Sequence, residues 1–274
     1  SEDSCTPADF DLTPYLVTGE NKLAAMVFRY TSASWLEDQD FWRFSGIYRD
    51  VLLYTKPQHH IEDVAVRAVP LERDGYTHGN LDVHLTFGDA AEKHVEILLC
   101  DPEGDCVEGE EAVITAKSHV CSMEAACVLL WSAEHPWLYH LMIRVHDAAG
   151  ALQEIVRVRV GFREFCIRDG VMQINGERIV FKGVNRHEFD SDHGRAMDPA
   201  LFEQDLIALK RANVNAIRTS HYPNSSRLYE LADIYGFYVI DETNLETHGT
   251  WMKNGACAKD AHTVPGDREE WLPA

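Results

Sequence analysis

A carboxylate and an imidazole lie two residues apart in the segment Glu246-Thr247-His248. In extended backbone, side chains at positions i and i+2 point to the same side, so Glu246 and His248 could bind one divalent cation together. The alternative is an ordinary loop, because a Glu-x-His sequence is common without any function. A position just after a buried strand would favour the metal site.

Two further histidines, His187 and His221, each lie close to an arginine, Arg186 and Arg218 respectively. Imidazole and guanidinium groups can donate hydrogen bonds to a neutral polyol and strengthen them as charge develops in a reaction. The chain has fourteen histidines, and a histidine is more often a structural or surface residue than a ligand. The pair is notable because both histidines follow predicted strands.

Two other segments have the chemistry of a sugar site. Asp241 and Glu242 form a candidate general acid/base pair, although carboxylates at strand ends also bind local backbone or arginine. Residues 35–43 combine Trp35 and Trp42 with acids, Asp40 among them. Aromatic rings stack on the C–H faces of sugars while carboxylates take hydroxyls. The alternative is a surface loop packed by its two tryptophans.

The second half of the chain alternates between strand and helix signals, which predicts a parallel sheet built from βα units. In a (β/α)8 barrel, active-site residues collect beyond the carboxyl ends of the strands. His187, His221 and Glu246 all fall at such positions. Asp198 and Pro199 are typical of a helix start. The predicted elements are a hairpin strand and apolar run over 176–184, helices over 199–212 and 225–235, and strands over 214–220 and 237–242.

The first 165 residues have the alternation and turn residues of β-structure. Two β-rich runs, 21–30 and 46–54, precede the rest, and the second is predicted to be a half-buried strand. Seven more strands at short intervals indicate an immunoglobulin-like sandwich. These seven are predicted over 61–69, 80–87, 94–100, 112–116, 125–130, 139–147 and 152–161.

Composition excludes several classes of protein. The chain has 25 basic and 45 acidic residues, a net charge of −20, which argues against nucleic-acid and membrane-surface binding. It contains no signal-peptide pattern and no apolar run of membrane-spanning length. Seven scattered cysteines favour reduced thiols in a cytoplasmic protein. The pairs Cys100/Cys106 and Cys121/Cys127 fit no common zinc spacing. The first residue is serine, and the last residues read as the approach to a helix, so we expect an internal segment of a longer protein.

Six motifs in order give the chain a resemblance to glycoside hydrolase family 2, in its lac-type bacterial β-galactosidase branch. Glu246-Thr-His248-Gly favours that branch over the β-glucuronidases and β-mannosidases. The match spans essentially the whole chain. The motifs lie at 36–51, 130–139, 161–164, 183–188, 216–224 and 242–249.

The resemblance implies a multidomain protein of β and α/β structure. Residues 1–55 correspond to the end of a jelly-roll β-sandwich that binds sugar. Residues 56–163 correspond to an immunoglobulin-like β-sandwich. Residues 164–274 correspond to the first part of a (β/α)8 TIM barrel, about three βα units.

The same resemblance implies roles for individual residues. Glu246 and His248 match two ligands of an active-site Mg²⁺. His187 and His221 match histidines that contact substrate and stabilise the transition state. Asp40 matches an aspartate that reaches the galactose and helps to bind Na⁺. Arg218 matches a supporting arginine beside the catalytic pocket.

The function implied is retaining hydrolysis of terminal non-reducing β-D-galactosides such as lactose, by a parent protein expected to be a cytoplasmic homo-oligomer. The acid/base glutamate, also the third Mg²⁺ ligand, and the nucleophilic glutamate match later barrel strands outside this chain. The chain alone is therefore predicted to be inactive. The alternatives are a non-catalytic carbohydrate-binding or interaction fragment, and a related family-2 enzyme such as a β-glucuronidase.

Overall fold

The computed structural model describes residues 3–253 and 256–257, and it divides into two compact units. The sandwich unit comprises residues 52–182 and 232–238. The α/β unit comprises residues up to 51, residues 183–231 and residues from 239 onward. The boundary passes through one helix and one strand near residues 231–239. Each unit is described by itself.

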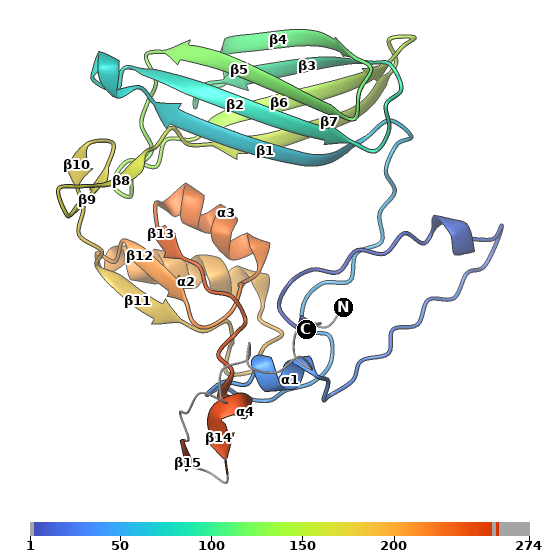
Figure 1. Ribbon diagram of the computed structural model, residues 1–274, viewed down its shortest axis with the longest axis vertical. Helices are drawn as coiled ribbons and strands as arrows, with labels where there is room; N and C mark the ends of the chain where they lie inside the picture. Colours follow the sequence, from blue (N-terminus) through green and yellow to red (C-terminus); the bar gives the residue numbers. More distant parts are fainter. Residues whose placement is uncertain (1–2, 254–255, 258–274) are drawn as a thin grey trace. The chain divides into compact units, whose positions relative to one another are not determined.

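The sandwich unit contains two antiparallel sheets that face each other (Figure 1). In the three-stranded sheet the order is β1-β2-β5, and in the four-stranded sheet it is β4-β3-β6-β7. Every pairing within them is antiparallel. The strands are β1 (Ile61–Pro70), β2 (His78–Phe87), β3 (Lys93–Cys100), β4 (Cys106–Ile114), β5 (Ser118–Ala126), β6 (Tyr139–Asp147) and β7 (Leu152–Val160).

Alternating side chains fill the space between the two sheets. On β6, Leu141, Ile143 and Val145 are fully buried, and the residues between them are partly exposed. Because successive side chains on a strand point to opposite faces, this alternation places one apolar face inward. The strands form one continuous hydrophobic core. The sandwich has seven strands, the number predicted, and five of them lie where they were predicted.

Two of the seven predicted strands were wrongly placed. The prediction had strands over 112–116 and 125–130, whereas the structure has β4 and β5 over Cys106–Ile114 and Ser118–Ala126. On β4, acidic residues and glycine hide the apolar alternation, because most of this edge strand is exposed. On β5, the buried face carries Cys121, Met123 and Ala125, which are weak strand signals.

Residues 183–240 contain the predicted alternation of strands and helices. Strands β11 (Gly183–Arg186) and β12 (Ala216–Thr219) are parallel, and the sheet order is β11-β12-β13. The helices are α2 (Pro199–Arg211) and α3 (Ser226–Tyr235), and β13 is Tyr238–Ile240. Asp198 caps α2 by accepting a hydrogen bond from the Ala200 backbone N–H. The predicted parallel pairing and both predicted helices are confirmed.

Smaller elements complete the described chain. The sandwich unit adds a 3₁₀ turn, η2 (Glu72–Asp74), and a small antiparallel sheet of order β10-β9-β8. The strands of that sheet are β8 (Phe165–Arg168), β9 (Val171–Ile174) and β10 (Glu177–Arg178). The α/β unit adds a 3₁₀ turn η1 (Thr13–Tyr15), helices α1 (Ala33–Leu36) and α4 (His248–Trp251), and the strand pair β14 (Met252–Lys253) and β15 (Ala256–Cys257). None of the helices described is long and apolar enough to cross a membrane.

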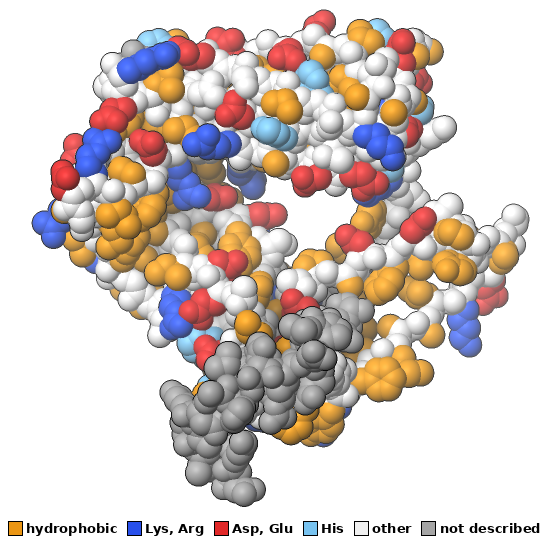
Figure 2. Space-filling view, viewed as in Figure 1, with side chains coloured by type: hydrophobic (Ala, Val, Ile, Leu, Met, Phe, Trp, Pro, Cys, Tyr) orange, Lys and Arg blue, Asp and Glu red, His pale blue; other side chains and the backbone are white. Residues whose placement is uncertain are grey.

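The N-terminal segment does not contain the strands predicted over 21–30 and 46–54. Residues 3–60 include no strand, and Met26 and Leu53 are 81% and 80% exposed. Figure 2 shows uncovered hydrophobic side chains along this segment. A strand needs a neighbour to pair its N–H and C=O groups. No described strand lies beside these runs, so their β-propensity is not realised and no jelly-roll sheet is present in residues 3–60.

Candidate active site

Three consecutive strands end in polar residues. His187 follows the last residue of β11, His221 lies two residues beyond β12, and Asp241 and Glu242 follow β13. The parallel register pairs Asn185 with Arg218, so the carboxyl ends of β11 and β12 lie level. The sheet therefore brings these segments to one edge, as expected for a site built on βα units.

Glu242 joins the arginine and the histidine of the second strand. The Arg218 Nε donates a hydrogen bond to Glu242 Oε1 at 2.6 Å, and His221 Nδ1 lies 2.8 Å from Glu242 Oε2. Partial burial alone would raise the pKa of the Glu242 carboxyl. The hydrogen bonds from His221 and Arg218 outweigh burial and hold that pKa below its ordinary value. Glu242 is thus an ionised carboxylate that fixes the orientation of both neighbours.

Glu246 and His248 meet in the predicted way, but not through extended backbone. Thr247 has a left-handed φ of 60°, and α4 begins at His248. Glu246 Oε2 lies 3.7 Å from His248 Nε2, and Glu246 Oε1 lies 3.1 Å from His221 Nδ1. The two side chains therefore lie together through a left-handed turn at Thr247 and not through extended backbone.

Contacts with α1 explain the turn at Thr247. The Thr247 and His248 backbone N–H groups donate to the carbonyls of Leu36 and Asp38, both at 2.8 Å. The Thr247 carbonyl accepts from the Thr250 N–H and hydroxyl. Because these contacts link segments about 210 residues apart in sequence, spacing within the Glu-Thr-His motif does not reveal them.

One group of side chains has the donors of a metal site. Atoms of His221, Glu242 and Glu246 all lie within 4.8 Å of one another. Two carboxylates and an imidazole form a donor set that divalent cations accept. The predicted ligand His248 borders this group through Glu246. Of the two predicted Mg²⁺ ligands, Glu246 therefore belongs to this group of donors, and His248 lies beside the group.

His187 is held by an aromatic ring from the N-terminal segment. The rings of Phe41 and His187 stack with centroids 4.6 Å apart and an interplanar angle of 7°. His187 also meets the ring of His221 edge-on at 5.6 Å. Burial lowers the pKa of His187, as do the neighbouring His221 and Arg195, while Asp40 acts in the opposite direction. The imidazole is therefore held in its neutral form near pH 7.

The His187 ring has an unused polar atom. Its Nδ1 is buried and has no hydrogen-bond partner among the described residues. Asp40 is exposed but close enough to act electrostatically on His187. Trp42, from the same predicted sugar-binding segment, packs on Phe189 at 4.4 Å and is 52% exposed. The predicted residues Asp40, His187 and His221 thus share one neighbourhood.

Two residues near the predicted site have structural contacts instead. Arg186 is buried, donates to Asp205 Oδ2 at 2.8 Å and also bonds Asn224. The Arg186 guanidinium is therefore engaged with α2 and with the segment that follows β12. Asp241, predicted as one half of an acid/base pair, accepts hydroxyl hydrogen bonds from Thr219 and Tyr229. Glu242, in contrast, faces His221 and Arg218.

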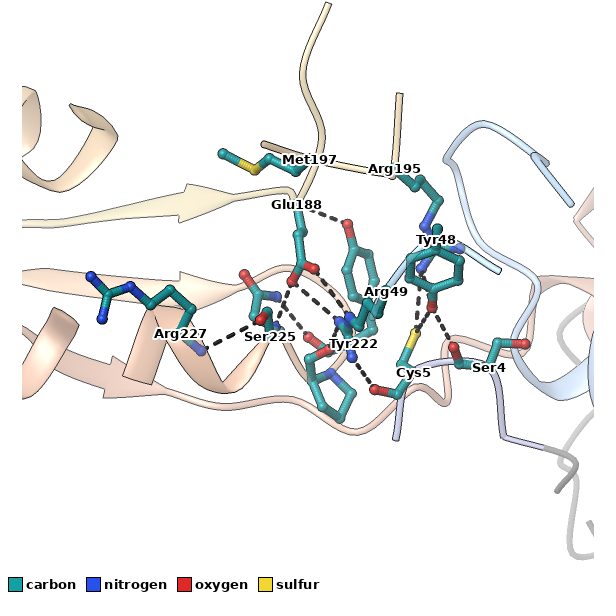
Figure 3. Close-up of polar contacts among 12 residues, drawn as sticks. Ser4, Cys5, Tyr48, Arg49, Glu188, Arg195, Met197, Tyr222, Ser225 and Arg227 are labelled. Carbon is teal, nitrogen blue, oxygen red and sulfur yellow. Dashed lines mark hydrogen bonds and ion pairs between the residues drawn. The ribbon is translucent and has the colours of Figure 1, made fainter. Parts of the chain in front are cut away.

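An ion pair between a half-buried arginine and a buried carboxylate, which the sequence did not predict, lies next to His187 in the chain. Arg49 contacts both carboxylate oxygens of Glu188, at 3.1 and 3.2 Å, and donates to the Pro223 carbonyl (Figure 3). Glu188 also accepts from the Ser225 backbone N–H at 2.7 Å. Glu188 follows His187 directly in sequence, so this ion pair fixes the backbone that carries the histidine.

Arg195 is a second unpredicted cation beside this ion pair. Its guanidinium lies over the rings of Phe41, Tyr48 and Tyr222, at 5.5, 4.2 and 5.0 Å. It donates to the Tyr48 hydroxyl at 3.1 Å (Figure 3). One such contact contributes about 0.5–2 kcal/mol. Arg195 therefore supports Phe41, which in turn supports His187.

Carboxylates, imidazoles and a guanidinium at the carboxyl ends of βα strands define the class of a βα enzyme site. Family models match the chain in three consecutive stretches. Residues 1–57 match the sugar binding domain of glycosyl hydrolases family 2, residues 59–163 match the model that carries the name of glycosyl hydrolases family 2 itself, and residues 165–274 match the TIM barrel domain of that family. The chain belongs to glycosyl hydrolase family 2.

Curated relatives align with the whole chain. A beta-galactosidase from Streptococcus thermophilus is 50% identical over 100% of this chain and 26% of its own length. A beta-galactosidase from Halalkalibacterium halodurans is 49% identical over 100% of this chain and 27% of its own length. The chain thus spans about a quarter of the length of these relatives.

Solved structures share the fold at lower identity. A Parabacteroides merdae beta-glucuronidase aligns with a TM-score of 0.70 at 23% identity, over 76% of this chain and 26% of that chain. A Bacteroides uniformis beta-glucuronidase 3 aligns with a TM-score of 0.69 at 26% identity, over the same shares. The arrangement of elements therefore extends beyond β-galactosidases.

Proposed function

We propose that this chain forms the substrate-binding part of a retaining β-galactosidase that hydrolyses terminal non-reducing β-D-galactosides such as lactose. The observation that carries the proposal is the 50% identity to a beta-galactosidase along the whole chain. The grouping of His187, His221 and Arg218 at strand ends supports it, because neutral sugars are bound by such donors.

In this proposal the two histidines contact the sugar from different strands. His187 is a neutral imidazole held flat by Phe41, so it can exchange hydrogen bonds with hydroxyls without bringing a net charge. His221 has Nδ1 against two carboxylates, which favours a proton on that nitrogen and directs Nε2 to the ligand. Arg218 is a positioning residue, since it holds Glu242 against His221. The Asp40 carboxylate accepts a hydrogen bond from a sugar hydroxyl.

We also propose that Glu246 and His248 are Mg²⁺ ligands, and that Asp40 contributes to a Na⁺ site. For Mg²⁺ the donor chemistry fits, because Glu246 lies beside His248 and Glu242 is close by. When bound, such a cation would supply positive charge that stabilises nearby carboxylates and developing negative charge. For Na⁺ the support is the exposed Asp40 carboxylate, which offers a hard oxygen ligand.

A chimera tests the proposed activity. The chain replaces the matching quarter of the Streptococcus thermophilus relative, and chromogenic β-galactosides and β-glucuronides are compared. We expect hydrolysis of the galactoside, with the product released in the β configuration. The 274-residue chain alone should show no turnover. A chimera that folds but prefers the glucuronide, or inverts the anomeric centre, would refute the proposal.

Variants of the chimera test the roles of the residues. His221→Ala should lower kcat by about 10²–10³, the usual cost of losing a preorganised transition-state donor. His94→Ala is the matched control, because His94 lies on the sandwich surface with half of its side chain exposed. EDTA should lower the rate and added Mg²⁺ should restore it. An unchanged rate in EDTA would contradict the proposed metal site.

A β-glucuronidase is the second candidate, because the solved structures cited above carry that name at TM-scores near 0.70. A glucuronide needs a cation for its carboxylate. The identity of 26% or less to those proteins, against 50% to a beta-galactosidase, makes it the weaker candidate. A binding-only fragment would release heat in a calorimetric titration with galactose but would support no hydrolysis in any chimera, and the absence of heat would count against it.

A further inference from the structure

Two cysteines face each other at the end of the β3–β4 hairpin, far in sequence from the candidate active site. Cys100 is the last residue of β3 and Cys106 is the first residue of β4. Their Sγ atoms lie 2.7 Å apart, and both are free thiols. Among the residues described, no other cysteine pair has its sulfur atoms in contact.

The register of the sheet accounts for this contact. Cys100 and Cys106 are direct cross-strand partners, because a bulge after Leu99 shifts the pairing by one residue. Opposite residues on antiparallel strands have Cα atoms about 4.5–5.5 Å apart. A disulfide requires Cα atoms about 4.4–6.8 Å apart. The pairing alone therefore places the two residues within bonding range.

The turn between them is held in place by Asp101. Its side chain accepts hydrogen bonds from the backbone N–H groups of Gly104 and Asp105, both at 2.9 Å. The Asp101 N–H donates to the Asp105 carbonyl, also at 2.9 Å. This network fixes the hairpin end without help from the sulfur atoms, so a bond between them needs no rearrangement of the turn.

We propose that Cys100 and Cys106 are an oxidation site, at which a small-molecule disulfide converts the two thiols into a reversible cross-strand disulfide. Cys106 is exposed, so its thiolate attacks the oxidant first. A mixed disulfide forms and one small thiolate leaves. The Cys100 thiolate then attacks Cys106 Sγ and expels the second small thiolate. The protein loses two protons and two electrons, and the oxidant is reduced to two thiols.

The difference between the two thiols supports this order of steps. Cys100 is only 7% exposed. Burial raises its pKa to about 11, with a further contribution from Cys106. A buried, protonated thiol is a poor first nucleophile but is well placed to resolve a mixed disulfide on its neighbour. Reduction by a monothiol restores the starting state.

The chain contains a matched control at the same spacing. Cys121 and Cys127 are also six residues apart, so proximity in sequence alone favours both pairs equally. In the fold, however, Cys121 lies within β5 and Cys127 directly follows that strand. Six residues of extended strand span about 20 Å, which a disulfide cannot bridge. The fold therefore permits one pair and forbids the other.

The experiment incubates the 274-residue chain with a glutathione redox buffer, under native conditions and in urea. Free thiols are then blocked by alkylation and disulfide-linked peptides are quantified by mass spectrometry. Under native conditions we expect the Cys100–Cys106 bond in at least tenfold excess over Cys121–Cys127. In urea the two bonds should form to similar extents. Added dithiothreitol should remove the native bond.

Variants complete the test. Cys100→Ser should leave Cys106 as a stable mixed disulfide with glutathione, because the resolving thiol is missing. Cys127→Ser should not change the yield of the Cys100–Cys106 bond. The proposal is overturned if both pairs form equally under native conditions. It is also overturned if Cys106 of the unsubstituted chain accumulates as the mixed disulfide, or if neither thiol of the pair reacts.

Discussion

The two units of the molecule have different interiors. Between the sheets of the sandwich unit, the buried side chains are almost all apolar, and they form one core. Of the seven buried polar or charged residues among those described, six belong to the α/β unit and only Lys93 to the sandwich. The six are Arg186, Glu188, Thr219, Ser220, Asn224 and Thr250.

This difference has a physical consequence. Apolar burial is not directional, so a sandwich core tolerates many residue choices at fixed volume. Buried ion pairs and hydrogen bonds require particular partners, and an unpaired one is costly. The α/β unit thus obtains defined positions for its site residues from contacts such as Arg49–Glu188. The sandwich unit obtains its stability from burial.

The largest expected effect follows from core burial in the sandwich. Leu141 on β6 is fully buried, so Leu141→Ala should cost about 2–5 kcal/mol through lost burial and a cavity. Hydrogen exchange of the sandwich strands measures the loss locally. Leu152→Ala on β7 is the control, because Leu152 is 51% exposed and should change stability by under about 0.5 kcal/mol. Similar losses in the two variants would contradict the apolar-core description.

The next effect tests the polar interior of the α/β unit. Glu188→Gln keeps the shape but leaves the Arg49 guanidinium without its buried carboxylate, which should cost about 2–3 kcal/mol. The loss should be seen as faster hydrogen exchange in β11 and β12. Glu230→Gln breaks an exposed i,i+3 pair with Arg227 and should have almost no effect. If Glu188→Gln also had almost no effect, the ion pair would not support the site.

The sequence predicted the sandwich well because its signal is local. Alternation on β2, β3 and β6 reveals both the strand and its buried face. The runs at 21–30 and 46–54 have similar propensity but no pairing partner among the described strands, and they are not strands. Propensity describes a residue, whereas pairing depends on another segment.

For the site, the sequence predicted positions but not partners. His187, His221 and Glu246 were found because strand ends can be located from hydrophobic runs. Phe41 and Arg49 were missed, since they lie about 140 residues before the residues they support. Glu242 was proposed as an acid or base, and its bonds to Arg218 and His221 require knowledge of strand order. Contacts at such distances leave no periodic pattern.

A smaller effect concerns Lys93, the buried charge of the sandwich among the residues described. The ammonium of Lys93 donates to backbone carbonyls of Asp89 and Ala91 and lies 3.1 Å from the Asp89 carboxylate. The hydrogen bond with His59 is the main cause that lowers the Asp89 pKa to about 2, and Lys93 adds to it. Asp89→Asn should therefore cost about 1 kcal/mol at pH 7, a modest value because Asp89 is one-third exposed.

The sign of the pH dependence follows from that lowered pKa. The folded state binds the proton less readily than the unfolded state, so the contribution of Asp89 is complete above its ordinary pKa of 3.8. It is lost as the pH falls from about 4 to about 2. Urea midpoints of the sandwich should show this loss in the unsubstituted chain and not in Asp89→Asn. An identical acid dependence in the two proteins would show that the buried ammonium does not need this carboxylate.

An effect of similar or smaller size measures one contact in the candidate site. The stacked rings of Phe41 and His187 should be coupled by about 0.5–1.5 kcal/mol, the usual value for an aromatic pair. A double-mutant cycle of Phe41→Leu and His187→Gln, measured by hydrogen exchange at the end of β11, isolates that coupling. Trp35→Leu replaces Phe41→Leu in the control cycle, because Trp35 contacts α4 at Gly249 instead. Coupling in the Phe41 cycle alone would show that an apolar contact, as well as the buried polar pairs, positions the histidine. Equal coupling in both cycles would mean that the N-terminal segment acts on the site as a whole.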